Sequence, residues 1–134
     1  MSDPLQIKRL LRRPQFLAAA KGVSEARGAV VIQRLERGDG SPHIGLGFTA
    51  TKKIGGAVQR NRAKRRLREA ARAMLAQYGV PGSDYVFIAR MGTTERAWDR
   101  LLDDVKSTLT RLATPKANRP SHARAPSGQD RQNP

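Results

Sequence analysis

The order of apolar and polar residues predicts three β-strands. Residues 29–35 (AVVIQRL) form a β-branched run that ends before the turn-forming residues 38–42 (GDGSP). In residues 43–51 the apolar side chains recur at every second position, and this period of two is typical of a strand. The mostly apolar run at 84–91 predicts a further strand near the centre of a sheet, where both of its faces are covered.

A period of three to four residues predicts three helices. The first begins at Pro14, whose missing N–H costs nothing in a first helical turn, and ends at Gly22. The second is a long basic helix that Gly79 and Pro81 end. Its apolar stripe consists of Ala63, Leu67, Ala70, Ala71, Met74 and Tyr78. The third begins near Thr94, and its expected buried stripe consists of Trp98, Leu101, Leu102, Val105, Leu109 and Leu112.

The resulting order is a helix, two or three strands, the basic helix, a strand and a helix. It predicts one α+β domain, in which helices pack on a small sheet. A chain of 134 residues is long enough for a modest hydrophobic core. Residues 114–134 contain four prolines and almost no large apolar side chains, so they cannot bury enough surface to offset the entropy lost on ordering. We therefore expect a folded domain at residues 1–113 and a disordered basic tail at residues 114–134.

The composition narrows the possible partners and chemistry. A formal net charge of +15 predicts a polyanionic partner, either nucleic acid or an anionic membrane. The sequence has neither an apolar run of about 18 residues nor the apolar core of a signal peptide, so we expect a soluble, cytoplasmic protein. There is no cysteine, and the two histidines, His43 and His122, lie far apart in the sequence, which argues against a metal centre.

The basic helix distinguishes between these partners. A charge run is most often a solvated face, but here Glu69 is the only acidic residue between Gly40 and Ser83. Repulsion between like charges three and four residues apart costs a few tenths of a kcal/mol for each pair, and an anionic partner removes this cost. A membrane-binding helix would carry large apolar residues, whereas this apolar stripe is mostly alanine. Nucleic acid is therefore the favoured partner.

The segment GFTATKKIGGAVQRNRAKRRLREA, residues 47–70, resembles the signature of the bacterial ribonuclease P protein subunit. In that family a strand and a pair of lysines lead through a glycine-containing turn into a helix that opens with Arg-Asn-Arg. The flanking segments RLLRRPQF and DYVFIAR extend the resemblance over nearly all of residues 8–112.

The resemblance implies a fold, an activity and partners. The expected order is α-β-β-β-α-β-α around a small, mostly antiparallel sheet, with a left-handed βαβ crossover through the basic helix. The family's protein binds a catalytic RNA and the 5′ leader of precursor tRNA, and the complex removes the leader. Hydrolysis belongs to the RNA and its Mg²⁺ ions, so the resemblance implies no catalytic residue, no cofactor held by the protein alone and no obligate protein partner. The sequence agrees, because it contains neither a nucleophile–base pair nor a suitable carboxylate cluster.

The resemblance also implies two binding surfaces. The face that contacts the RNA subunit consists of Arg60, Asn61, Arg62, Lys64, Arg65 and Arg68. The leader-binding cleft, between the first helix and the sheet, includes Phe16, Lys52, Lys53 and Arg90. Ordinary packing of the helix on the sheet is an alternative role for Phe16.

The sequence departs from the family pattern at several positions. Ala20 stands where a second aromatic residue is common, and Ala29 and Ile32 replace aromatic residues of the strand. The leader cleft would then depend more on charge than on stacking. Ala50 and Ala63 replace larger aliphatic residues. Two rival functions are a ribosomal or other structural RNA-binding protein and a protein nuclease that acts without RNA.

Overall fold

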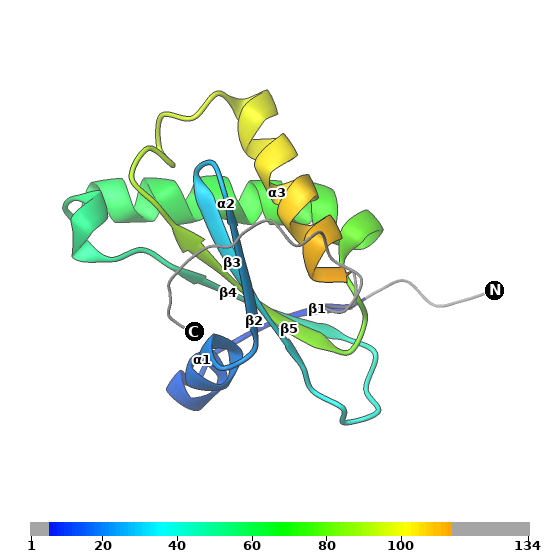
Figure 1. The fold of residues 1–134 in the computed structure, drawn as a ribbon. Helices are drawn as coiled ribbons and strands as arrows, with labels where there is room; N and C mark the ends of the chain where they lie inside the picture. The colour runs from blue at the N-terminus through cyan, green and yellow to red at the C-terminus, as the bar shows by residue number, and fades with distance from the viewer. Residues whose placement is uncertain (1–5, 114–134) are drawn as a thin grey trace.

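The computed structural model describes residues 6–113 and forms three layers, with a five-stranded sheet between helices (Figure 1). The predicted α+β class is confirmed. The predicted tail at residues 114–134 lies outside the described residues. In chain order the elements are β1 (Ile7–Arg9), α1 (Arg13–Ala20), β2 (Val23–Arg27), β3 (Val30–Glu36), β4 (Ile44–Thr49), the short 3-10 helix η1 (Lys52–Ile54), α2 (Ala57–Tyr78), β5 (Ser83–Ala89) and α3 (Trp98–Ala113).

The sheet is mixed, so the expectation of a mostly antiparallel sheet is corrected. Its strand order is β1-β4-β5-β3-β2. β1 pairs with β4 and β4 with β5 in parallel, whereas β3 pairs with β5 and with β2 in antiparallel fashion. The parallel neighbours β4 and β5 are joined through α2, as a crossover requires. The left hand of this crossover stays a prediction from the resemblance.

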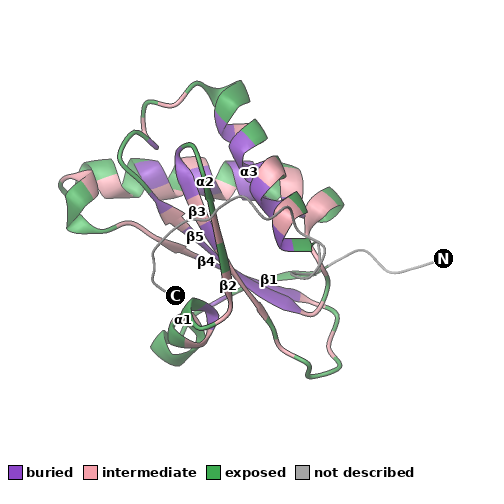
Figure 2. Cartoon of the chain, in the orientation of Figure 1, coloured by how far each residue is buried: buried purple, intermediate pink, exposed green. Residues whose placement is uncertain are grey.

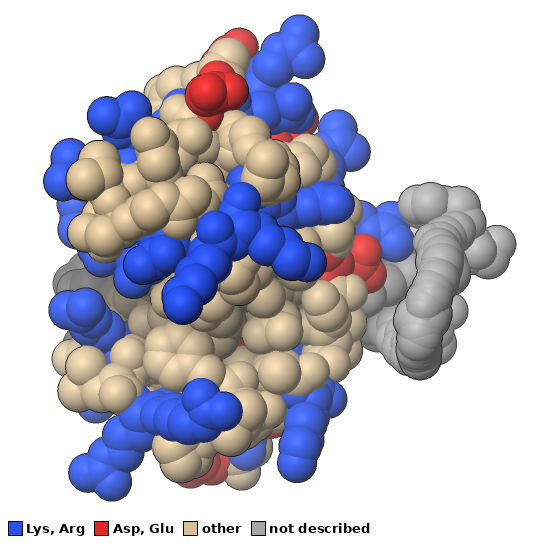
Figure 3. Space-filling view, turned by 90° about the vertical axis from the view of Figure 1, so that its left-hand side faces the viewer, with Lys and Arg blue, Asp and Glu red and all other residues tan. Residues whose placement is uncertain are grey.

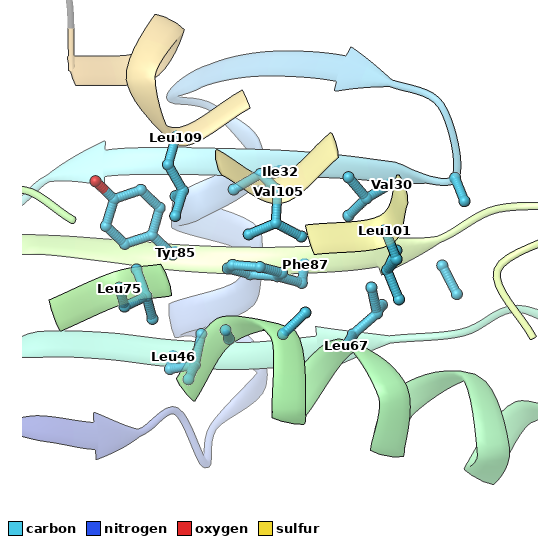
Figure 4. Close-up of a cluster of buried hydrophobic side chains, with 14 of the residues drawn as sticks. Val30, Ile32, Leu46, Leu67, Leu75, Tyr85, Phe87, Leu101, Val105 and Leu109 are labelled. Atoms are coloured by element: carbon cyan, nitrogen blue, oxygen red, sulfur yellow. The ribbon is translucent and has the colours of Figure 1, made fainter. Parts of the chain in front are cut away.

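The main core lies between one face of the sheet and helices α2 and α3 (Figure 4). From the central strand β5, Tyr85 and Phe87 project into this core and are fully buried. The predicted stripe of α2 is confirmed, because its members are buried or packed against the same cluster. Complete burial of a large apolar side chain contributes about 1.5–3 kcal/mol. The other fully buried members of this cluster include Val30, Ile32, Ile44, Leu67, Leu75, Leu101, Val105, Leu109 and Leu112.

Helix α1 covers the opposite face of the sheet. Val86, whose side chain alternates with those of Tyr85 and Phe87, is buried there beside Leu10 and Ala19. Phe16 is partly buried and packs against the same cluster. Figure 2 shows that the outer side of α1 is mostly exposed, so α1 contributes a smaller core than α2 and α3. Because both faces of β5 are covered, its predicted central position is confirmed.

The sequence pattern did not locate β1 or β2, although β2 supplies the first of the three strands between α1 and α2 in the implied order, which lacks only β1. β1 contains three exposed residues and is held at the sheet edge by its parallel pairing with β4. β2 is largely polar and pairs with β3 through a two-residue turn at Gly28 and Ala29. Gly28 has a φ of +55°, and a β-carbon at this position would collide with the carboxylate of Asp104.

Helix α3 begins at Trp98 rather than near Thr94. The preceding residues form turns because their polar groups bind elsewhere: Thr93 Oγ1 donates a 2.7 Å hydrogen bond to Ala29 O. Asp104 of α3 is buried although its side chain is charged. Its carboxylate accepts hydrogen bonds from Ala29 N at 3.1 Å and from Arg96 Nε at 2.9 Å. This cluster fixes the β2–β3 turn against α3.

A second buried ion pair joins the end of β3 to the start of β5. Arg37 Nη1 lies 2.7 Å from Asp84 Oδ1, and its side chain is 12% exposed against 9% for Asp84. The same guanidinium donates to the main-chain oxygens of Ser41, His43 and Ser83. Burial alone would lower the pKa of Arg37, but hydrogen bonds to Asp84 and Asp39 outweigh it and raise that pKa above its ordinary value.

Candidate RNA interface

The exposed side of α2 carries cations that no described residue neutralises. Arg62 and Arg65 are exposed, Lys64 is half-buried, and none of the three side chains forms an ion pair or hydrogen bond within residues 6–113. Asn61 is likewise exposed and has no side-chain hydrogen bond to the described chain. Their donors are therefore available to an external acceptor. The opposite side of the same helix is fixed in the core through Ala63 and other small residues.

Arg60 and Arg68, the other two residues of α2 predicted to contact the RNA subunit, interact with other residues of this chain. Arg60 Nη1 donates a 3.1 Å hydrogen bond to Gly55 O, which ties the first turn of α2 to the segment after η1. The guanidinium carbon of Arg68 lies 5.5 Å from the centre of the Phe48 ring, in a cation–π contact. Arg68 keeps its hydrogen-bond donors free, whereas Arg60 already uses one of them.

Arg66 and Arg72 of α2 have partners within the described chain that the sequence pattern does not predict. Arg66 donates to Thr93 O at 2.7 Å and to Arg96 O at 2.6 Å, so it holds the segment before α3. Its guanidinium also lies 5.7 Å from the ring centre of Trp98, which is 43% exposed rather than part of the buried stripe. Arg72 pairs with Glu69 at 3.1 Å on the exposed surface.

The predicted cationic residues of the leader cleft lie at one end of the sheet. Because β4 and β5 are parallel, their carboxyl ends meet at the same edge. Lys52 and Lys53 follow β4 in η1, and Arg90 follows β5. The two lysines are exposed, while Arg90 Nη1 reaches Gly28 O at 3.3 Å. Figure 3, which views the η1 side of the molecule, shows many more Lys and Arg than Asp and Glu side chains.

Phe16 lies on the α1 face of the sheet. A β-carbon added to Gly47 would meet the ring of Phe16 at 2.6 Å, so the missing side chain of Gly47 lets the ring approach the strand. Phe16 is partly buried by this packing and partly open to solvent. The alternative role of Phe16, packing of the helix on the sheet, is therefore confirmed. The exposed part of its ring is the surface that a ligand could contact. Ala20, one turn later, is exposed and offers no ring.

Ile32 and Ala29, two of the residues that depart from the family pattern, do not lie in this cleft. Ile32 is fully buried in the main core beneath α2 and α3, on the face of the sheet opposite Phe16. Ala29 is 4% exposed and belongs to the same main core. These residues therefore cannot contact a leader that lies beside α1, and the expectation that they alter such contacts is corrected.

Within residues 6–113 no group of three or more His, Cys, Asp or Glu side chains is arranged to hold a metal ion. The most buried carboxylates, Asp84 and Asp104, are paired with Arg37 and Arg96. Across the same residues no helix is long and apolar enough to cross a membrane.

Together, the mixed sheet, its crossover helix and the unpaired cations of α2 define an α+β RNA-binding protein. The chain belongs to the Ribonuclease P family, whose model matches residues 6–113. This match confirms the resemblance found over residues 8–112. The chain is a protein component of a ribonucleoprotein enzyme that cleaves tRNA precursors, and it partners an RNA subunit.

Curated relatives and solved structures agree. The Ribonuclease P protein component of Caulobacter vibrioides is 62% identical over 109 residues, which cover 81% of this chain and 73% of the relative. That of Ruegeria pomeroyi is 48% identical over 109 residues, covering 80% and 87%. The RNase P protein of Staphylococcus aureus superposes with a TM-score of 0.64 at 25% identity, covering 78% and 94%. For the Thermotoga maritima RNase P protein the TM-score is 0.63 at 26% identity, covering 78% and 96%.

Proposed function

We propose that the exposed side of α2 anchors the RNA subunit and that the cleft beside α1 receives the 5′ leader of precursor tRNA. The first part rests on one observation: some arginines are paired with carboxylates of the described chain, and others are not. Arg37 and Arg96 are bound to buried carboxylates, whereas Arg62 and Arg65 are exposed and have no partner among the described residues. Free guanidinium groups suit phosphate, because they can donate two parallel hydrogen bonds to it.

The proposal for the leader rests on charge and on one aromatic ring. Lys52, Lys53 and Arg90 supply positive charge at the carboxyl ends of β4 and β5, and Phe16 presents part of its ring on the α1 face of the same sheet, next to Gly47 of β4. A single-stranded nucleic acid is recognised by this combination of backbone charge and aromatic stacking. In this proposal the protein contributes affinity and position. Hydrolysis of the phosphodiester belongs to the RNA subunit and to Mg²⁺ ions of the assembled holoenzyme.

The leader assignment is tested by comparing two ligands of the reconstituted holoenzyme. Changing Lys52 and Lys53 together to glutamine should weaken the binding of precursor tRNA and leave the binding of mature tRNA nearly unchanged, because mature tRNA has no leader. A control with equal charge loss changes Arg27 and Arg100, which lie on β2 and α3. Equal losses of affinity for both ligands, or the same precursor-specific loss in the control, would reject the assignment.

A further inference from the structure

A groove lies on the other face of the sheet, between the edge strand β1 and helix α2. Its volume is about 340 Å³, which falls at the lower end of the roughly 300–1,000 Å³ typical of small-molecule sites. The residues that line it are Ile7, Arg9, Leu46, Phe48, Arg68 and Arg72. Neither the RNA anchor formed by Asn61, Arg62, Lys64 and Arg65 nor the cleft beside Phe16 requires this groove.

The floor of the groove is apolar and packs on the main core. Phe48 packs against the core residue Phe87, with ring centres 5.8 Å apart, and remains partly exposed. Leu46 is 8% exposed, whereas Ile7 is 41% exposed on the edge strand. An aliphatic side chain with this exposure in β1 leaves apolar surface in contact with water, which a flat apolar ligand group would cover.

The rim of the groove is cationic. Arg9 comes from β1, while Arg68 and Arg72 come from successive turns of α2. None of the residues that line the groove is acidic; the nearest carboxylate of α2 is Glu69, which pairs with Arg72 at 3.1 Å on the exposed surface. An exposed pair of this kind contributes about 0–1 kcal/mol, so an incoming phosphate can displace Glu69 at little cost.

An apolar floor beneath three arginines matches a nucleotide better than a bare anion. A phosphate alone gains nothing from contact with the apolar surface of Ile7 and Leu46, whereas a flat base would bury that surface. Proteins that recognise RNA commonly take an unpaired base out of the stack and place it against aromatic rings or guanidinium planes. Arg68 already lies with its guanidinium over the Phe48 ring, so the plane against which a base would pack exists without the ligand.

The position of the groove selects the RNA that would fill it. Asn61, Arg65, Arg68 and Arg72 follow one another at spacings of four, three and four residues, and therefore share one side of α2. The groove continues the face proposed to anchor the RNA subunit. The proposed leader cleft, in contrast, lies beside Phe16 on the opposite face of the sheet.

We propose that this groove holds one unpaired nucleotide of the RNA subunit. The base packs against the Arg68 guanidinium that covers Phe48 and against the apolar surface of Ile7 and Leu46, and the flanking phosphates lie against Arg9 and Arg72. The inference rests on the proposed function, because it extends the α2 anchor to the edge of the sheet. It assigns a binding role to β1, a strand whose short, polar sequence otherwise only closes that edge.

Two variants test the groove in the full-length protein, reconstituted with its RNA subunit. Ile7→Trp fills the groove without changing the charge, and Ile7→Leu keeps it apolar and open. Loss of one stacked base predicts an affinity roughly 5- to 100-fold lower for the Trp variant and nearly normal affinity for the Leu variant. Base-reactive chemical probing of the RNA in the holoenzyme should show one or two nucleotides that become reactive with Ile7→Trp only.

Charge is tested separately, so that the proposal does not depend on the folding of the Trp variant. Arg9→Gln should flatten the dependence of log K on log salt by about 0.7–0.9, the value expected for one phosphate contact. Arg27→Gln is the matched control, because Arg27 is an exposed arginine of the opposite edge strand β2 and forms only a 3.6 Å surface pair with Asp103. This control should leave the slope nearly unchanged.

Three outcomes would overturn the inference. The first is normal RNA-subunit affinity and unchanged probing in both Ile7→Trp and Arg9→Gln. The second is a loss confined to precursor tRNA, which would place the substrate rather than the RNA subunit in the groove. The third is an equal slope change in Arg27→Gln. Failure of the proposed function is distinguishable, because it would appear as normal RNA binding after loss of Arg62, Lys64 and Arg65.

Discussion

The α2 anchor makes a quantitative prediction about salt. Changing Arg62, Lys64 and Arg65 together to glutamine removes three cations whose side chains have no partner within residues 6–113. Glutamine is a good helix former, and the substitutions relieve repulsion between positions such as Arg62 and Arg65, so α2 should remain folded. Its buried stripe, which includes Ala63 and Leu67, is untouched. Any loss of RNA binding then reports on the interface rather than on the fold.

The expected size follows from the number of free cations. If each of the three neutralises one phosphate, counterion release predicts that the slope of log K against log salt falls by about 0.7–0.9 per cation, or about 2 to 3 in total. An arginine with an internal role would contribute less, and for that reason Arg60 and Arg66 are left unchanged. Affinity should be reduced most at low salt, where counterion release is most favourable.

The assay is titration of the RNA subunit with the protein at several salt concentrations. The matched control changes Arg27, Arg100 and Lys106 to glutamine, which removes the same charge from β2 and α3. Thermal unfolding of both variants checks that the fold is retained. Similar slope losses in the two variants would refute the reasoning, because the diffuse net charge rather than the α2 face would then hold the RNA.

Three further predictions concern stability. Arg37→Met leaves the carboxylate of Asp84 buried without its cation and should lower the free energy of unfolding, measured in urea, by about 3–5 kcal/mol. Gly28→Ala would hold an alanine in the left-handed backbone conformation and bring its β-carbon against Asp104. This strain of at least about 1–3 kcal/mol should lower the melting temperature. Burial raises the pKa of Tyr85, so stability should be fully present below about pH 10 and be lost as pH rises further; Tyr85→Phe should weaken this loss in alkaline denaturation curves.

The sequence predicted the elements whose patterns are local. The three helices, and the strands at 29–35, 43–51 and 84–91, each carry their own periodicity, and the structure confirms them. β1 has no such pattern, because three exposed residues can join a sheet only through the neighbouring strand. The parallel pairing of β1 and β4 is likewise a property of two segments about 37 residues apart, which no local period encodes. The order α-β-β-β-α-β-α implied by the resemblance has no strand before α1, so the expected sheet lacked this parallel pair and was mostly antiparallel.

The sequence predicted which residues of α2 are accessible better than it predicted the roles of individual arginines, and their contact with RNA stays a prediction. Asn61, Arg62 and Arg65 are exposed and Lys64 is half-buried, which leaves their polar groups accessible to an RNA. Arg66 belongs to the same basic run, and its periodicity does not distinguish it from Arg65. Its role depends on the turn before α3, which brings the carbonyl groups of Thr93 and Arg96 to its guanidinium. Such a role appears only when segments about 27 and 30 residues apart meet in the folded chain.

The division among the arginines also explains how so basic a chain forms a stable domain. Arg37, Arg96 and Arg111 are paired with carboxylates that join distant segments, at 2.7, 2.9 and 3.1 Å. Within residues 6–113 the carboxylates of Glu25, Asp39, Glu69, Asp84, Asp103 and Asp104 pair with arginines, whereas Arg62, Lys64 and Arg65 of α2 have no carboxylate partner there. The internal pairs therefore serve two purposes at once. They hold β2, β3, β5 and α3 together, and they leave the excess positive charge on the surface formed by α2 and the carboxyl ends of β4 and β5, where an RNA can neutralise it.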